Sequence, residues 1–157
     1  MRAEAPFGGS ELELRWLDVG QGDATLVRFA GTTWLVDLGL GSMRGRDRLV
    51  PQLLRAGVKR VDRAWVTHGD ADHWGGLIDL LASPVRLDTL VLGDGSTPPA
   101  KMLAALRAVR HPPVVVRAAA GWLRQGAAVS VRVLHPPVNF LPRGTNEGSL
   151  VLVLESE

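Results

Sequence analysis

A short polar segment constrains the fold of this chain more than any other feature. Residues 67–76 read THGDADHWGG and follow directly on the apolar run Ala64-Trp65-Val66. A surface turn also favours Asp and Gly, but turn chemistry does not explain two histidines interleaved with two aspartates. The segment therefore predicts a metal site at the end of a buried strand, with the candidate ligands His68, Asp70, Asp72 and His73.

The spacing of these four residues predicts two ions. Side chains at alternate positions of a tight loop point the same way, so His68 and Asp70 can converge on one ion. Asp72 and His73 are adjacent and face a second direction, where a second ion can bind. In hydrolases, paired ions of this kind lie about 3.5–4 Å apart. The glycines that flank the cluster allow the backbone turns that such a loop needs.

The absence of cysteine limits the ligands further. It excludes disulfides and thiolate ligands, so histidine nitrogen and carboxylate oxygen must hold any metal. These donors suit Mn, Zn or Mg better than Cu(I) or iron–sulfur clusters. We expect no small organic cofactor.

Apolar periodicity along the chain predicts an α/β layered fold. Strands are expected over 11–18, 24–30 and 32–37, the last two forming a hairpin around Gly31. Leu49, Leu53, Leu54 and Val58 recur at helical spacing, and Gly57 ends that helix. The remaining segments alternate strands at 63–67, 89–92, 114–116, 129–134 and 149–154 with helices at 75–81 and 99–110.

The polar loop carries a family resemblance. H-x-[H/D/E]-x-D-H is the signature loop of the metallo-β-lactamase superfamily, and His68, Asp70, Asp72 and His73 match it. The resemblance implies an αββα sandwich with a dinuclear site at the edge of its two sheets. It assigns His68 and Asp70 to one ion, and Asp72 and His73 to the other. Asp70 replaces the more usual second histidine, and this oxygen-rich set makes Mn an option beside Zn.

A second resemblance narrows the family. Residues 17–24 (LDVGQGDA) and 34–39 (WLVDLG) are similar to the N-terminal signatures of the C-terminal domain of the ComEC family, which internalises DNA in competent bacteria. The LHPP turn at 134–137 and the strand at 149–152 resemble that family too. The resemblance implies a metal-dependent phosphodiesterase or nuclease acting on single- or double-stranded DNA during uptake. It also implies a transmembrane channel in the same polypeptide, with this soluble domain on the extracytoplasmic side of the inner membrane.

Further residues are candidates for supporting roles. Asp18, Asp23 and Asp37 lie at strand ends, where carboxylates can orient histidine ligands or simply cap the strands. Trp74 is placed to line the pocket. The superfamily has a third histidine of the first metal site near His135, although the turn at Pro136-Pro137 explains that histidine equally well.

Arginine dominates the basic residues. All but Lys59 and Lys101 of the 18 basic residues are arginine, and the net charge is +2. A cluster begins at Arg44, Arg46 and Arg48, whose guanidinium groups suit phosphate oxygens of DNA. The alternative is a solvated surface.

The chain departs from the superfamily after residue 154. The superfamily supplies a bridging aspartate and a last histidine there, and neither precedes Glu157. We therefore expect residues 11–157 to be the N-terminal portion of the domain, incomplete at its C-terminal end. Residues 1–10 are expected to be a disordered tail or domain boundary. Metal occupancy should be partial or absent, and activity weak or absent. A stand-alone hydrolase of a small ester or thioester and a non-catalytic DNA-binding module remain as alternatives.

Overall fold

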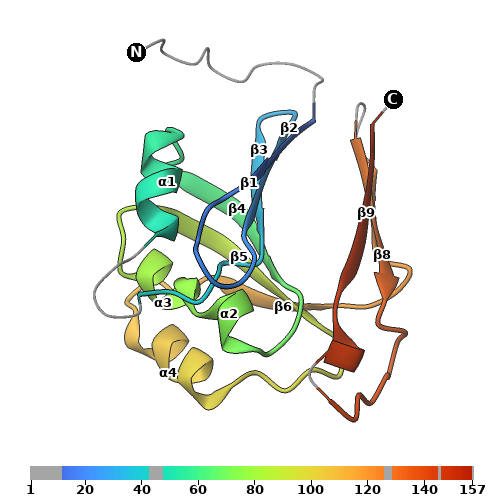
Figure 1. Cartoon of the computed structure of the whole chain (residues 1–157). Coiled ribbons are helices and arrows are strands. Elements are labelled where there is room, and N and C mark those ends of the chain that lie inside the picture. Colours follow the sequence, from blue (N-terminus) through green and yellow to red (C-terminus); the bar gives the residue numbers. More distant parts are fainter. Residues whose placement is uncertain (1–11, 43–47, 126–128, 145, 157) are drawn as a thin grey trace.

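The computed structural model describes residues 12–42, 48–125, 129–144 and 146–156. Its larger sheet has six strands in the order β1-β2-β3-β4-β5-β6 (Figure 1). These strands are β1 (Glu13–Trp16), β2 (Thr25–Phe29), β3 (Thr32–Val36), β4 (Arg60–Val66), β5 (Arg86–Gly93) and β6 (Val114–Ala118). β1, β2 and β3 pair antiparallel, whereas β3 to β6 pair parallel.

The hairpin predicted around Gly31 is confirmed. Ala30 and Gly31 form its two-residue turn with φ values of 46° and 71°. Positive φ at both central positions matches the twist of the flanking strands and is the geometry that such short hairpins favour.

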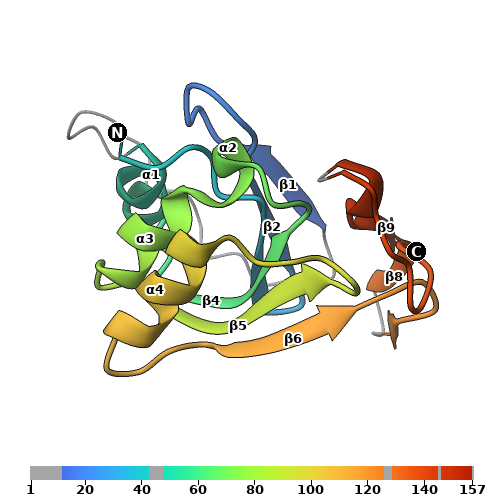
Figure 2. The same cartoon turned by 90° about the horizontal axis from the view of Figure 1, so that it is seen from below.

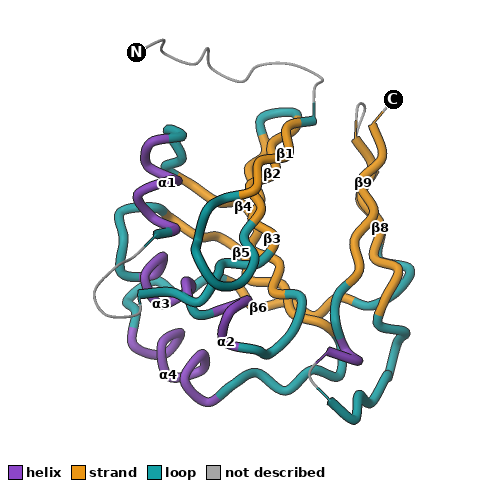
Figure 3. The backbone as a smooth tube through the Cα atoms, viewed as in Figure 1, coloured by secondary structure: helices purple, strands orange, loops and turns teal. Residues whose placement is uncertain are grey.

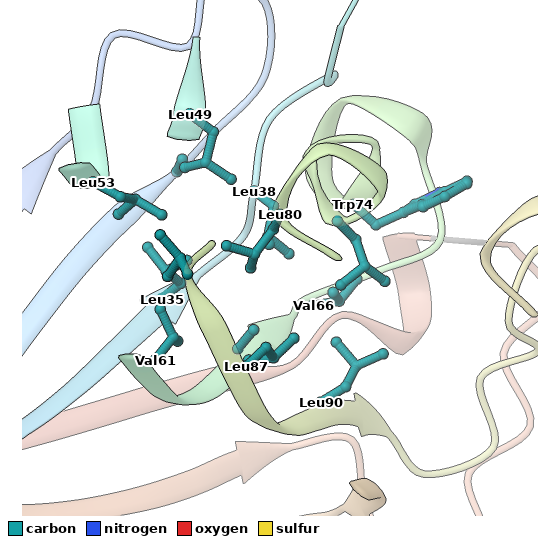
Figure 4. Packing of buried hydrophobic residues seen from close by; sticks show 14 of the residues in the cluster. Leu35, Leu38, Leu49, Leu53, Val61, Val66, Trp74, Leu80, Leu87 and Leu90 are labelled. Carbon is teal, nitrogen blue, oxygen red and sulfur yellow. The ribbon is translucent and has the colours of Figure 1, made fainter. Parts of the chain in front are cut away.

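Helices cover one face of this sheet (Figure 2). They are α1 (Leu49–Arg55), α2 (Ala71–Trp74), α3 (Gly76–Leu81) and α4 (Ala100–Ala108). Their apolar sides bury a leucine-rich core against the strands, with Leu35, Leu53 and Leu80 fully buried (Figure 4). The parallel connections pass through these helices because parallel neighbours cannot be joined by a tight turn.

A second sheet lies against the opposite face (Figure 3). It comprises β7 (Leu123–Gln125), β8 (Val129–His135) and β9 (Val151–Ser156) in that order, with the 3-10 turn η1 (Asn146–Gly148) before β9. Aromatic residues of the large sheet, Trp34 and Trp65, pack against Val131 and Val133 of the small one. The helix–sheet–sheet arrangement confirms the predicted layered fold, and no helix covers the outer face of β7–β9 within the described ranges.

Three local predictions differ from the structure. β4 begins at Arg60, three residues before the predicted start, because parallel pairing with β5 already holds Arg60 and Val61. The helix expected at Gly75 is preceded by α2, which starts inside the polar loop at Ala71. β7 was not predicted, since three residues are too short for a periodic pattern. None of the helices in the described ranges has the length and apolar character of a membrane span.

Candidate metal centre

The polar loop follows β4 at the edge where the parallel strands end. Because β3 and β4 run parallel with Val36 beside Trp65, their carboxyl ends meet, and Asp37 lies next to Thr67. The backbone N–H of Asp37 donates to the carbonyl of Trp65 over 2.8 Å. The N–H of Leu150, the residue directly before β9 of the other sheet, donates to the carbonyl of Thr67 over 2.8 Å. Both sheets therefore fix the start of the loop.

Asp37 is the hub of this region and the one charged residue classed as buried among the described residues, at 4% exposure. Its Oδ1 accepts the backbone N–H of Thr67 at 2.8 Å. Its Oδ2 accepts the Thr67 hydroxyl at 2.7 Å and lies 2.7 Å from Nδ1 of His73. Burial raises the pKa of the Asp37 carboxyl above its usual range, although the hydrogen bonds from Thr67 and His73 act to lower it.

These contacts determine the tautomers of two histidines. When Asp37 is ionised its carboxylate can only accept, so Nδ1 of His73 then carries a proton and donates it. The hydroxyl of Thr67 donates its single proton to Asp37 in a hydrogen bond. Because Nδ1 of His68 lies 2.9 Å from that hydroxyl, it must donate to the hydroxyl oxygen. Both histidines therefore present the lone pair of Nε2, which is the form that binds a metal.

The two imidazole rings lie together. Their centroids are 3.9 Å apart, and Nε2 of His68 is 3.5 Å from Oδ2 of Asp70. Ala71–Trp74 form a helical turn that brings His73 beside His68. The assignment of His68 and His73 to two different ions stays a prediction.

The donor chemistry of this loop fits a divalent ion. Two Nε2 lone pairs and carboxylate oxygens are ligands that Zn²⁺ and Mn²⁺ accept. Within the described ranges, however, no group of three or more His, Cys, Asp or Glu side chains stands close enough together to hold an ion. The loop thus supplies oriented histidines without a closed ligand set.

The segment 18–23 packs directly on the metal loop. Gly22 has a φ of +92°, and a Cβ placed there would lie 1.8 Å from the backbone oxygen of Asp72. Only glycine permits this approach. The segment 34–39 also contacts the metal loop, because the N–H of Leu38 donates to the carbonyl of His73 over 2.8 Å. The two sequence signatures at 17–24 and 34–39 therefore form the backbone cradle of the loop.

With this geometry established, comparison with known proteins shows what the chain is similar to. The family model described as the metallo-beta-lactamase superfamily matches residues 17–85, which include the cradle and the whole polar loop. The chain has the metallo-beta-lactamase fold. Domains of this superfamily are generally hydrolases, and its solved members generally bind two divalent metal ions.

Solved structures of this superfamily fold superpose on the chain. A metallo-beta-lactamase with a HARLDQ motif from Cronobacter sakazakii superposes with a TM-score of 0.60 at 18% identity, over 90% of this chain and 51% of that one. CmlA, a diiron beta-hydroxylase from Streptomyces venezuelae, gives a TM-score of 0.55 at 20% identity, over 92% and 28%. At such identities the likeness shows the fold alone.

Two curated relatives are competence proteins. ComE operon protein 3 of Bacillus subtilis is 28% identical over 96% of this chain and 21% of its own length. Competence protein ComA of Neisseria gonorrhoeae is 42% identical over 38% of this chain and 8% of its own length. The chain therefore spans about a fifth or less of the length of either relative.

The other predicted supporting residues lie elsewhere in the domain. Of the three strand-end aspartates, Asp37 contacts a histidine. Asp18 instead accepts the N–H of Gly20 and pairs with Arg48 at 3.6 Å, with its side chain 88% exposed. Asp23 contributes its backbone carbonyl to the N–H of Gly39. Of the three, Asp37 is the one that follows a strand paired with β4.

Trp74 packs inward. It is 5% exposed within the leucine-rich core, and its Nε1 donates to the carbonyl of Gly69 over 3.1 Å. It therefore holds the metal loop through the carbonyl of Gly69, and its role in lining a pocket stays a prediction. A small cavity does open beside His68, and its other walls come from Leu92, Met102 and the segment 96–99.

His135 contacts residues of the C-terminal part of the chain. Its Nε2 hydrogen-bonds the carbonyl of Glu147 over 2.8 Å, and its ring packs edge-on against Phe140 at 5.1 Å between centroids. It joins no ligand group in the described ranges, so its role as a ligand stays a prediction.

Arg44 and Arg46 lie outside the described residues. Arg48 lies at the cradle, its guanidinium near Gly20 and Asp18.

Sequence reasoning missed Thr67. Its hydroxyl links Asp37 to His68, yet nothing in a threonine at a strand end indicates a relay. The only available signal was its position directly before the first histidine.

Proposed function

We propose that this metallo-beta-lactamase domain hydrolyses phosphodiester bonds of DNA with the help of divalent metal ions. The observation that carries the proposal is the Asp37–Thr67 network, which fixes both histidines with Nε2 available. Such outer contacts, which set ligand orientation and basicity, are the usual support of a working metal site. A purely structural histidine would not need a buried carboxylate, whose desolvation is costly.

The chain's own residues would divide the work. His68 and His73 would hold the metal through Nε2, with Asp70 and Asp72 as oxygen donors. Bound divalent ions, Mn or Zn, would supply an activated water and neutralise charge on the phosphate. Asp37 and Thr67 would keep the rings in place, and Trp74 would anchor the loop through Gly69.

The DNA substrate rests on the ComEC resemblance and on the two competence relatives. Arg48, beside the cradle, is the described arginine proposed to contact DNA phosphates, together with Arg44 and Arg46. The same resemblance supports a place on the extracytoplasmic side of a bacterial inner membrane, next to a transmembrane channel of the same polypeptide.

A non-catalytic DNA-binding module is a second candidate. It is favoured by the lack of a closed ligand group in the described ranges. Under this alternative the histidine pair would bind metal weakly or not at all, and the arginines alone would bind DNA.

A calorimetric and nuclease experiment separates the two. Mn²⁺ is titrated into the 157-residue chain, His68→Ala and His111→Ala; His111 is an exposed histidine after α4 and serves as the matched control. We expect weak binding that His68→Ala abolishes and His111→Ala leaves unchanged. Degradation of single- and double-stranded DNA by the full-length protein with Mn²⁺ is then compared with the His68→Ala, Asp72→Ala double variant. Equal degradation by both would rule out the proposed mechanism.

A further inference from the structure

A cluster of aromatic and arginine residues lies between the two sheets, on the face of the large sheet away from the helices. Its aromatic members form a chain of edge and tilted contacts. The ring centroids of Trp34 and Trp65 are 5.3 Å apart, and those of Trp65 and Trp122 are 5.1 Å apart. Trp34 and Trp65 are fully buried, whereas Trp122 is partly exposed.

Two guanidinium groups lie over these rings in cation–π contact. Cζ of Arg63, from β4, lies 5.8 Å from the ring centroid of Trp34 and 5.5 Å from that of Trp122. Cζ of Arg124, from β7, lies 5.7 Å from the same Trp34 ring. Burial lowers the pKa of Arg63, and the positive charge of Arg124 lowers it further. The fold thus holds two cations close enough to repel one another.

No described carboxylate forms an ion pair with Arg63 or Arg124. Arg60, Arg86 and Arg132 each form an ion pair with a carboxylate, but among the described residues no carboxylate lies within ion-pair distance of Arg63 or Arg124. The acid whose charge acts on Arg63 is Asp62.

Asp62 is itself engaged on both of its oxygens. Its Oδ2 accepts the backbone N–H of Thr33 at 2.8 Å, and its Oδ1 pairs with Arg60 at 3.4 Å. The rings of Trp34 and Trp122 offer only cation–π attraction to the guanidinium groups, which is weaker than an ion pair with a desolvated anion.

We propose that Arg63 and Arg124 form a phosphate-binding site, separate from the metal loop. Guanidinium forks match phosphate oxygens, and a phosphate group offers enough acceptor oxygens to engage both forks at once. Both side chains are half-buried, so they remain accessible from solvent. β7 is the edge strand of its sheet, so no described strand pairs with its outer side. The phosphate could be a free ion or part of a nucleic-acid backbone, since both present the same oxygens.

The position along β4 keeps this site apart from the metal centre. Four residues lie between Arg63 and His68. Because an extended strand rises about 3.3 Å per residue, the Cα atoms of the two can lie up to roughly 16 Å apart. A phosphate at Arg63 is therefore proposed to be distinct from one held by the metal loop.

The test follows the five indole N–H signals of the tryptophans by NMR. Inorganic phosphate is one probe and a short single-stranded oligodeoxynucleotide is the other, both in the presence of EDTA so that metal-bound phosphate cannot contribute. The variants are Arg124→Gln and Arg63→Lys. Arg132→Gln, on the neighbouring strand β8, is the matched control because it removes the same charge from an arginine paired with Glu155.

We expect saturable shifts of the Trp34 and Trp122 signals with at least one probe. Arg124→Gln should weaken that binding about tenfold, because a charge-assisted hydrogen bond is lost, and Arg132→Gln should leave it within twofold. Arg63→Lys keeps the charge but loses the fork, and should weaken binding as well. Shifts with inorganic phosphate alone identify a free-phosphate site, and shifts with the oligonucleotide alone identify a nucleic-acid contact. No saturable shift with either probe, or equal losses in Arg124→Gln and Arg132→Gln, would overturn the proposal and leave the metal-dependent function untouched.

Discussion

The carboxylate of Asp37 accepts the Nδ1–H of His73 over 2.7 Å, although 36 positions separate the two residues in the sequence. This contact joins the end of β3 to the helical turn that follows the metal loop. Asp37 adopts a φ of 57°, a conformation that non-glycine residues rarely take. The surrounding hydrogen bonds hold it there, and residues held in such conformations concentrate at functional sites.

Asp37→Asn should reduce metal affinity about 10- to 100-fold. The amide can still accept the N–H of Thr67, but an NH₂ group facing His73 would favour the tautomer with the proton on Nε2. Mn²⁺ or Zn²⁺ titration measures the loss, and ¹⁵N shifts of the His73 ring report the tautomer.

Asp62→Asn is the matched control for this change. Asp62 also accepts a backbone N–H at the edge of β4, that of Thr33, but it touches no histidine. Its replacement should leave metal affinity unchanged. If Asp37→Asn bound metal as tightly as the wild type, the network would not act on the ligands.

Thr67→Val should uncouple His68 from Asp37. Valine keeps the shape but removes the hydroxyl that donates to Asp37 and accepts from His68. Two hydrogen-bond partners are left unsatisfied, so the free energy of unfolding should fall by about 1–3 kcal/mol. Thr67→Ser keeps the hydroxyl and should restore most of both stability and metal affinity. Urea denaturation and metal titration of the two variants provide the measurement, and a serine variant as weak as the valine variant would contradict the relay.

The sequence predicts the layers and the metal loop well but not the internal geometry of the site. Strand alternation and the glycine turn at Gly31 are local properties, and they give the β2–β3 hairpin correctly. The approach of His68 to His73 depends on a helical turn at Ala71–Trp74, which is only four residues long. The contacts of Asp37 depend on the parallel register of β3 with β4. Which strands become neighbours in a sheet is set by contacts between distant segments, and local patterns in a single sequence do not predict it.

Trp74→Phe should loosen the metal loop. The variant keeps the aromatic packing of a side chain that is 5% exposed but loses the hydrogen bond to the carbonyl of Gly69. We expect a loss of about 1–2 kcal/mol in the free energy of unfolding, together with faster amide exchange in the segment 68–75. Trp16, which is 74% exposed on β1, provides the control. Trp16→Phe should change stability by less than about 0.5 kcal/mol and leave exchange in the metal loop unaltered.

Gly22→Ala should be among the most damaging single-methyl changes in the chain. The added Cβ would lie 1.8 Å from the backbone oxygen of Asp72, and the φ of +92° is itself unfavourable for alanine. Because the obstacle is backbone on α2, relief requires the cradle and the metal loop to separate. The expected cost is about 3 kcal/mol or more in the free energy of unfolding, with loss of metal binding.

Gly31→Ala separates the two causes. Gly31 also has a positive φ, +71°, but a Cβ there would meet nothing within 4 Å. Its replacement should therefore cost only the conformational strain, about 1–2 kcal/mol, and leave metal affinity intact. Chemical denaturation of both variants gives the comparison. Equal losses of stability in the two would mean that backbone conformation alone, and not the contact with Asp72, accounts for the glycine at position 22.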